Sequence, residues 1–207
     1  MSQLAIFLCL YLLPIQTDAG HGLMNSFGNI EWLPDAGINP DQIFYPIDSW
    51  AETIESFFST DSVGALAIYL KLSKEKLAEI VEMTKQDLVT EASVAEQQYL
   101  RYLSTISDEN FYKDNVSSTD SELKLLNTLL EHRYILAIEY PDLPPITRKK
   151  VILKINNELE TLYTKVESKI PQTQKDSLFF RKDEVAWIWE IAEESDLTQK
   201  SDDNERH

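Results

Sequence analysis

Apolar residues recur every three or four positions along most of the chain between residues 47 and 194, which is the spacing of one face of an α-helix. Capping residues and prolines divide this region into separate helices. The predicted helices run over residues 49–58, 60–86, 90–106, 119–138, 147–170 and 177–194. No segment alternates apolar and polar residues between turn residues, so no strand is predicted. The expected fold class is all-α, with an irregular N-terminal segment clipped onto an antiparallel bundle of about six helices.

Two capping boxes mark helix starts in this pattern. Ser49 with Glu52, and Thr119 with Glu122, place a hydroxyl three residues before a carboxylate, and the two side chains can satisfy free amides reciprocally. The helix over 119–138 then carries a typical apolar stripe. Its members are Leu123, Leu126, Leu129, Leu130, Tyr134 and Ile138. We expect each such stripe to face a common core.

The segments outside the helices are polar or irregular. Residues 20–46 contain clusters of Gly, Asn, Pro and Asp and form an extended segment, whose apolar residues we expect to dock on the bundle. Those residues are Trp32, Leu33, Ile43 and Phe44. Residues 107–118 form a polar stretch between two helices, and residues 195–207 read as a disordered acidic tail. The helical domain therefore covers residues 47–194, with three helices in its second part, 119–194.

The first 19 residues have the layout of a secretory signal peptide. Residues 4–13 are apolar, Pro14 follows, and small or tolerated residues precede a cleavage point after Ala19. The apolar core is too short to span a bilayer as a stable anchor. A buried N-terminal helix is the alternative. If cleavage occurs, Cys9 is removed and the exported chain cannot form a disulfide.

Composition narrows the classes of function. The chain has 35 acidic and 19 basic residues and a formal net charge of −16, which disfavours contacts with nucleic acid and anionic lipid. Only 5 of the 207 residues are glycine, so a phosphate-binding loop is not expected. An extracytoplasmic protein that binds another protein or a cell-envelope component fits this composition.

The titratable residues form no recognisable catalytic or metal-binding motif. His21, His132 and His207 are isolated, and His132 is expected to be partly exposed on a helix. Residues 75–82 carry three glutamates, which we interpret as a solvated helix face. Residues 148–150 form a basic triplet that we expect to pair with acidic neighbours. No catalytic, cofactor-binding or metal-binding residue and no cofactor are therefore assigned.

Part of the chain resembles a known family. Residues 40–52 run Pro-Asp-Gln-Ile-Phe-Tyr-Pro-Ile-Asp-Ser-Trp-Ala-Glu, and residues 57–61 and 70–80 continue the likeness. This order resembles a bacterial domain family of unknown function that carries a Pro-Asp-Ser-Pro-Leu-Tyr-Pro-Leu-Lys-Arg motif and a Leu-Ala-Glu-rich helix. The resemblance covers residues 37–106, and it implies an exported or membrane-anchored protein without assigned catalytic residues.

The aromatic residues of the motif have a physical interpretation of their own. Pro46 biases Tyr45 away from helical geometry. Phe44, Tyr45 and Ile47 can then lie as an extended clip across the groove between the first two helices.

A second resemblance lies near the C-terminus. Leu159, Tyr163 and residues 180–188 are similar to the motifs of a helical lysozyme-inhibitor domain. The cysteines of that family and its Arg-Asp pair after the tryptophan are missing here. The resemblance implies an inhibitor that covers a cationic cell-wall hydrolase.

Two tryptophans near the C-terminus point in different directions. Trp187 and Trp189 are two positions apart on a helix, so their side chains point about 160° from each other. One of them is available to anchor a partner, unless it packs on the segment of Trp32 or Trp50.

These observations lead to one functional prediction and two alternatives. The protein is expected to be an exported, non-catalytic bacterial protein that acts through protein or cell-envelope contacts. The alternatives are an inhibitor of a lysozyme-type hydrolase and an enzyme that uses paired carboxylates, which would need two acids with opposed pKa shifts in one pocket. No nucleic-acid partner and no membrane span after cleavage are expected. The partner's identity and the oligomeric state are left open.

Overall fold

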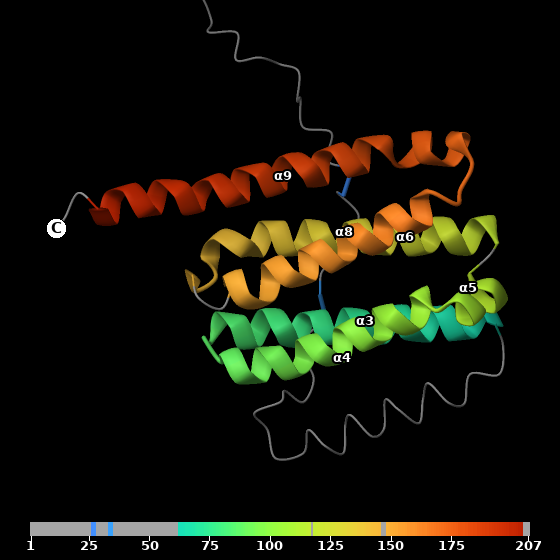
Figure 1. Cartoon of the computed structure of the whole chain (residues 1–207), viewed down its shortest axis with the longest axis horizontal. Coiled ribbons are helices and arrows are strands. Elements are labelled where there is room, and N and C mark those ends of the chain that lie inside the picture. Colours follow the sequence, from blue (N-terminus) through green and yellow to red (C-terminus); the bar gives the residue numbers. More distant parts are fainter. Residues whose placement is uncertain (1–25, 28–32, 35–61, 117, 146–147, 205–207) are drawn as a thin grey trace, which may run out of the picture.

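Six α-helices account for most of the described chain, as the computed structural model shows (Figure 1). The structure describes residues 26–27, 33–34, 62–116, 118–145 and 148–204. The helices are α3 (Ser62–Lys85), α4 (Val89–Ser107), α5 (Glu109–Asn115), α6 (Thr119–Glu139), α8 (Leu153–Glu167) and α9 (Gln172–Asn204). The described residues contain no strand, and the all-α prediction is confirmed.

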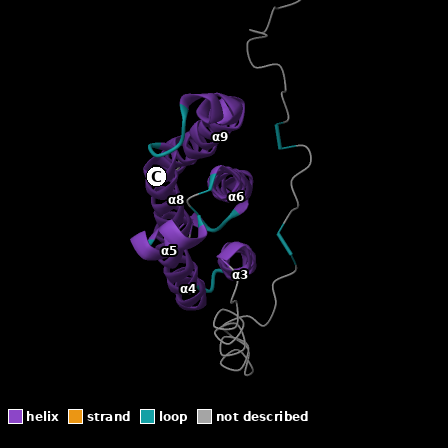
Figure 2. Cartoon of the chain, turned by 90° about the vertical axis from the view of Figure 1, so that its right-hand side faces the viewer, coloured by secondary structure: helices purple, strands orange, loops and turns teal. Residues whose placement is uncertain are grey.

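Successive long helices run in opposite directions, so the bundle is antiparallel along the chain (Figure 1). α3 and α4 form a closely packed pair on one side. α6 lies in the middle and contacts α3, α8 and α9. α9 lies at the outer edge, where it packs on α6 and on the 3₁₀ turn Tyr140–Asp142 (Figures 1 and 2). Among the helices that the structure describes, none packs against the outer long side of α9.

The helices found differ from the helices predicted. The predicted helix over 49–58 lies outside the described residues, and α5 occupies the stretch we expected to be merely polar. Asp108 Oδ1 accepts hydrogen bonds from the backbone N–H groups of Asn110 (3.0 Å) and Phe111 (3.2 Å) and so caps α5. Tyr112 is buried, and its hydroxyl donates to Glu122 at 2.7 Å. A local cap and one buried aromatic side chain hold this short helix in place.

The start of α6 is displaced by one residue from the predicted capping box. Ser118, not Thr119, is the N-cap, and its hydroxyl accepts from the Ser121 N–H at 3.3 Å. The stripe of α6 is buried at Leu126, and at Leu129 and Leu130 beside it. Ile138, in contrast, is 41% exposed. Ile138, in the last turn of α6, therefore lies beyond the edge of the core. The apolar spacing of a helix does not show how far the neighbouring helices extend alongside it.

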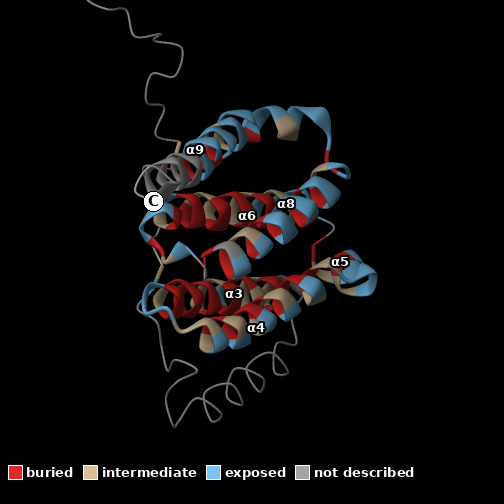
Figure 3. Cartoon of the chain, turned by 60° about the vertical axis from the view of Figure 1, so that its left-hand side comes forward, coloured by how far each residue is buried: buried red, intermediate tan, exposed pale blue. Residues whose placement is uncertain are grey.

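The buried side chains of α3, α4, α6, α8 and α9 join in one hydrophobic core. Figure 3 shows this core as the buried faces that the helices turn toward one another. Examples from each helix in turn are Leu77, Ile80, Tyr99, Ile106, Leu125, Leu126, Ile155, Leu159, Val185 and Trp189.

The proline-rich connection between α6 and α8 contains a π-helical segment, Arg148–Ile152, directly before α8. Thr147, where the predicted helix over 147–170 begins, lies outside the described residues. Arg148, the first residue of the basic triplet that we expected to pair with acidic neighbours, is buried. Its guanidinium Nη1 donates to the Pro141 carbonyl at 3.1 Å and lies 5.1 Å from the centre of the Tyr140 ring. The connection is thus held by an inward-facing arginine.

α9 is longer than predicted at both ends. It begins at Gln172 rather than residue 177, and its backbone is helical through Asn204, where we expected a disordered tail from Ser195. No proline or glycine occurs between residues 172 and 204, so no residue breaks the helix at the point where the apolar pattern stops.

Parts of the N-terminal segment dock on the bundle as expected. Leu33 packs partly buried against the core. Phe27 is buried and stacks on Tyr134 of α6, with ring centres 4.3 Å apart. The signal peptide over residues 1–19, the clip of Phe44, Tyr45 and Ile47, and the docking of Trp32, Ile43 and Phe44 lie outside the described residues.

Candidate functional site

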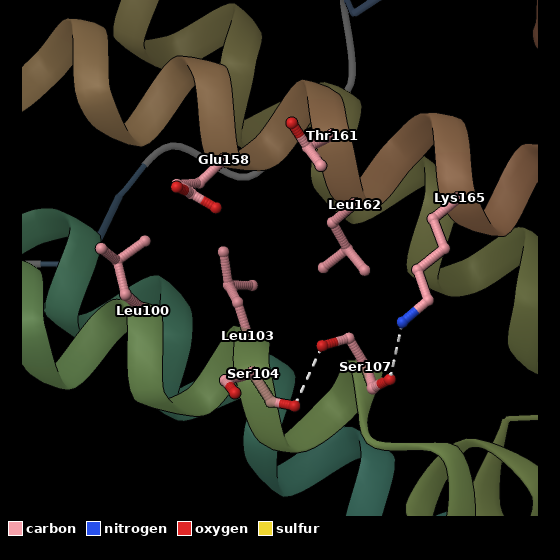
Figure 4. A pocket seen from close by; sticks show the side chains of 8 residues that line it. All are labelled: Leu100, Leu103, Ser104, Ser107, Glu158, Thr161, Leu162 and Lys165. Carbon is pink, nitrogen blue, oxygen red and sulfur yellow. Dashed lines mark hydrogen bonds between the residues drawn. The ribbon is translucent and has the colours of Figure 1, made fainter.

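A shallow groove of about 390 Å³ lies between α4 and α8 (Figure 4). Three leucines and three hydroxyl side chains line it, and two charged residues of α8 complete its wall. The lining residues are Leu100, Leu103, Ser104, Ser107, Glu158, Thr161, Leu162 and Lys165. Lys165 Nζ donates to the Ser107 carbonyl oxygen at 3.1 Å and thereby links the two helices.

The groove lacks the features of a catalytic centre. Glu158 and Lys165 are both exposed to solvent, and the lining contains neither histidine nor cysteine. A general acid or base is usually tuned by burial or by a charged neighbour in a closed site. This arrangement can receive a small amphipathic group, but it offers no activated nucleophile.

His132, the histidine that the described residues contain, is sealed inside the bundle. His132 is 1% exposed, which corrects the expectation of a partly exposed surface residue. Its Nδ1 shares a 2.9 Å hydrogen bond with the Tyr99 hydroxyl of α4. Burial, with a smaller contribution from the positive charge of Lys74, lowers the pKa of His132 to about 3. A neutral imidazole that no substrate can reach serves packing rather than catalysis.

Glu79 also differs from its predicted role in a solvated acidic face. The side chain is buried, and one carboxylate oxygen lies 2.6 Å from Lys76 Nζ. The two residues form a buried ion pair one turn apart on α3. Among the described residues, no three His, Cys, Asp or Glu side chains gather closely enough to hold a metal ion.

The most distinctive surface feature is the outward side of α9. Phe179 and Phe180 are 59% and 57% exposed, Trp187 is 40% exposed and Ile191 is 48% exposed. Phe180, Trp187 and Ile191 are spaced by seven and four residues, so they fall within about 40° of the helix circumference. We call these three residues the α9 stripe. Exposed apolar surface that is gathered on one side of a helix marks a candidate interaction site.

The inward side of the same helix is fully used by the core. Leu178, Val185, Trp189 and Ala192 are buried, and Figure 3 shows the contrast between this buried side and the exposed side. Trp189 Nε1 donates to the Arg133 carbonyl at 3.0 Å, while Trp187 is substantially exposed. The prediction that the two tryptophans point in different directions is confirmed. α9 therefore has a core face and a second apolar face.

Four exposed acidic residues form a row beside the α9 stripe. They are Asp176, Asp183, Glu190 and Glu194, spaced by seven, seven and four residues. We call them the acidic row. Because this spacing repeats that of the stripe, the two rows run side by side along the helix.

The two basic residues in the middle of α9 are turned toward the bundle. Arg181 Nη1 donates to Asn127 Oδ1 at 2.8 Å and lies 3.4 Å from Glu131 Oε1, both on α6. Lys182 Nζ lies 2.8 Å from Glu167 Oε2 of α8. The acidic row thus receives no compensation from these two cations.

The sequence contained a signal for the stripe that our interpretation missed. The sequence analysis predicted that either Trp187 or Trp189 is available to anchor a partner, but it assigned no apolar stripe to the solvent side of this helix. The spacing of Phe180, Trp187 and Ile191 defines a second stripe on the same helix, which could have been found by testing the segment for two apolar faces.

Part of the chain matches a protein family whose function is unknown. Residues 37–134 match the family described as domain of unknown function (DUF5667). No curated protein and no solved structure matches the chain. A domain of a family of unknown function was predicted over residues 37–106, and the match supports such a domain over the longer range 37–134. The Pro-Asp-Ser-Pro-Leu-Tyr-Pro-Leu-Lys-Arg motif and the lysozyme-inhibitor resemblance stay predictions. The match ends within α6, so α9 and its stripe lie outside it.

The helices of the described residues were also compared with the requirements of a membrane span. None of them combines the length and the apolar composition needed to cross a bilayer.

Proposed function

We propose that the protein is an exported, non-catalytic binding protein and that the outward side of α9 is its contact surface. The observation that carries this proposal is the alignment of Phe180, Trp187 and Ile191 on the solvent side of a helix whose opposite side is fully packed. Exposed tryptophan and phenylalanine supply large contact areas with few rotatable bonds, which is why aromatic residues are common binding hot spots.

The contact surface can be tested with envelope extract and matched variants. We expect the immobilised full chain to retain a defined protein, and the Trp187→Ala/Ile191→Ala variant to lose it. Val94→Ala is the control, because Val94 is an exposed apolar residue on α4, far in sequence from the stripe. Retention of the same protein by all three chains, or no specific retention by the wild type, would contradict the proposal.

Export is a separate part of the proposal and has its own test. The full-length chain, expressed in a bacterial host, is expected to appear outside the cytoplasm with Gly20 as its first residue. Recovery of the intact chain with residues 1–19 from the cytoplasm would remove the export proposal without affecting the contact surface.

Inhibition of a lysozyme-type hydrolase is the second candidate function. The observation that favours it is the acidic row beside Trp187, which suits a cationic enzyme surface. The purified protein should slow lysis of cell walls by a muramidase. Undiminished lysis at stoichiometric excess would exclude this function. The third candidate, a carboxylate-based enzyme, has no supporting observation among the described residues.

A further inference from the structure

Two parallel rows on α9 present different chemistry to solvent. The α9 stripe is apolar and aromatic, and the acidic row beside it carries four carboxylates. Phe179 contacts Phe180 edge to face, with ring centres 5.6 Å apart, and widens the apolar surface at the N-terminal end of the stripe. A ligand of this surface must therefore offer apolar contacts and positive charge side by side.

We infer that this surface binds a basic amphipathic helix of another protein. This inference rests on the proposed function and adds the class of partner. The partner's apolar side chains cover Phe180, Trp187 and Ile191, and its lysine or arginine side chains lie along the acidic row. Charge complementarity of this kind speeds association and rejects partners of the wrong sign.

The dimensions of the stripe set the length of the partner helix. Phe180 and Ile191 are eleven positions apart, which corresponds to about 16 Å along a helix axis. A partner helix of about four turns covers this length. Its apolar residues are expected at helical spacing along one face, with basic residues on the flank beside the acidic row.

A second copy of this chain fits the surface less well. Arg181 and Lys182 are held by Glu131 and Glu167 of their own bundle, so neither cation is available to the acidic row of another copy. Each copy also carries a formal net charge of −16. Two such surfaces brought together would place carboxylates near one another without compensation.

A lipid surface is also disfavoured by the acidic row. Interfacial amphipathic helices usually carry lysine and arginine beside their apolar face, where they meet anionic headgroups. Here carboxylates occupy that position, so anionic lipid would repel this side of α9.

The experiment uses the full chain and two synthetic helical peptides. Both peptides have 18 residues and the same leucine face; one has lysine on its polar face and the other has glutamate. Binding is measured by calorimetry at low and at high salt. We expect the lysine peptide to bind, the glutamate peptide to bind at least tenfold more weakly, and the lysine peptide to lose affinity as salt rises.

Variants of each row locate the binding on α9. Asp183→Asn/Glu190→Gln should weaken the lysine peptide about threefold at low salt and have little effect at high salt. Trp187→Ala/Ile191→Ala should weaken it about tenfold at both salt concentrations. Asp114→Asn/Glu109→Gln is the control, since it removes the same charge from exposed positions on α5.

Each other outcome overturns the inference in a defined way. Equal binding of both peptides contradicts the basic partner, and equal weakening by the control variant reveals a general attraction to an acidic protein. Failure of both peptides to bind excludes a helix as the partner. Self-association, or binding to neutral phosphatidylcholine vesicles, that depends on Trp187 assigns the surface to a second copy or to lipid. The extract experiment with Val94→Ala still reports on the contact surface in each case.

Discussion

His132 on α6 and Tyr99 on α4 share a hydrogen bond of 2.9 Å although neither side chain is accessible to solvent. The bond links α4 to α6 inside the hydrophobic core. Burial is the main reason that the pKa of His132 falls to about 3. Burial also raises the pKa of the Tyr99 hydroxyl, so both groups stay uncharged in the folded protein at neutral pH.

The first prediction concerns the pH dependence of stability. Unfolding exposes His132, whose pKa returns to its ordinary value near 6.5, so the unfolded chain binds a proton that the folded chain does not. The free energy of unfolding should therefore fall as the pH drops from about 6.5 toward 3. By linkage, this residue contributes a loss of about 2 kcal/mol between pH 7.5 and pH 5. Urea unfolding of the wild type and of His132→Gln, which cannot take up this proton, measures the difference. Identical pH dependence of the two proteins would contradict the assignment.

The second prediction concerns the docked N-terminal segment. Phe27 is buried between Tyr134 and the Arg181 guanidinium, which lies 5.0 Å from its ring centre. The Ser26 N–H donates to Glu184 Oε2 at 3.0 Å beside it. Phe27→Ala should lower the free energy of unfolding by about 3 kcal/mol, because it empties a packed site. Phe179→Ala is the matched control and should change it by less than about 0.5 kcal/mol, since its ring is largely exposed. Equal urea midpoints of the two variants would show that the segment does not stabilise the bundle.

The third prediction separates the two tryptophans. Trp189→Phe should lower the free energy of unfolding by about 1–3 kcal/mol, because it removes the indole N–H that donates to the Arg133 carbonyl and puts a smaller ring in a packed site. Trp187→Phe keeps an aromatic ring on the exposed side and should change stability by less than about 0.5 kcal/mol. Chemical unfolding followed by circular dichroism gives both values without relying on tryptophan emission. A larger loss for Trp187→Phe would place the core face of α9 elsewhere.

The fourth prediction tests the helix that the sequence interpretation missed. Asp108→Ala removes the acceptor of the Asn110 and Phe111 N–H groups and should cost about 1 kcal/mol. Asp114→Ala, near the other end of α5, removes the same functional group from an exposed position and should have almost no effect. Thermal unfolding of both variants provides the comparison. If the two behave alike, the cap does not hold α5.

The helices themselves were largely predictable because their signals are local. The apolar spacing around Leu126, Leu129 and Leu130 and the prolines after Glu139 indicate where a helix exists and where it ends. α5 was not predicted, because it is short and Tyr112 is its buried residue. The full length of α9 was not predicted, because the helix continues beyond the residues that carry the apolar pattern.

Burial of polar side chains was not predictable in the same way. Glu79 and His132 were predicted to be surface residues, since charged and polar groups are usually solvated, and the burial of Arg148 was not predicted. Each has a hydrogen-bond partner that offsets part of the cost of its burial: the Pro141 carbonyl for Arg148, Lys76 for Glu79 and Tyr99 for His132. A sequence pattern does not state which partner will be within reach.

The sequence by itself determined that the chain is helical, where most of its helices lie and that its acidic residues greatly outnumber its basic ones. Only the tertiary structure decided that α9 lies at the edge of the bundle, with Trp189 in the core and Trp187 on the open side. Packing of α9 against the bundle also places Arg181 and Lys182 beside Glu131 and Glu167, so these two cations do not compensate the acidic row. The physical reason is that helix formation depends on neighbours three or four residues away, whereas exposure of a helix face depends on which distant helices pack against it.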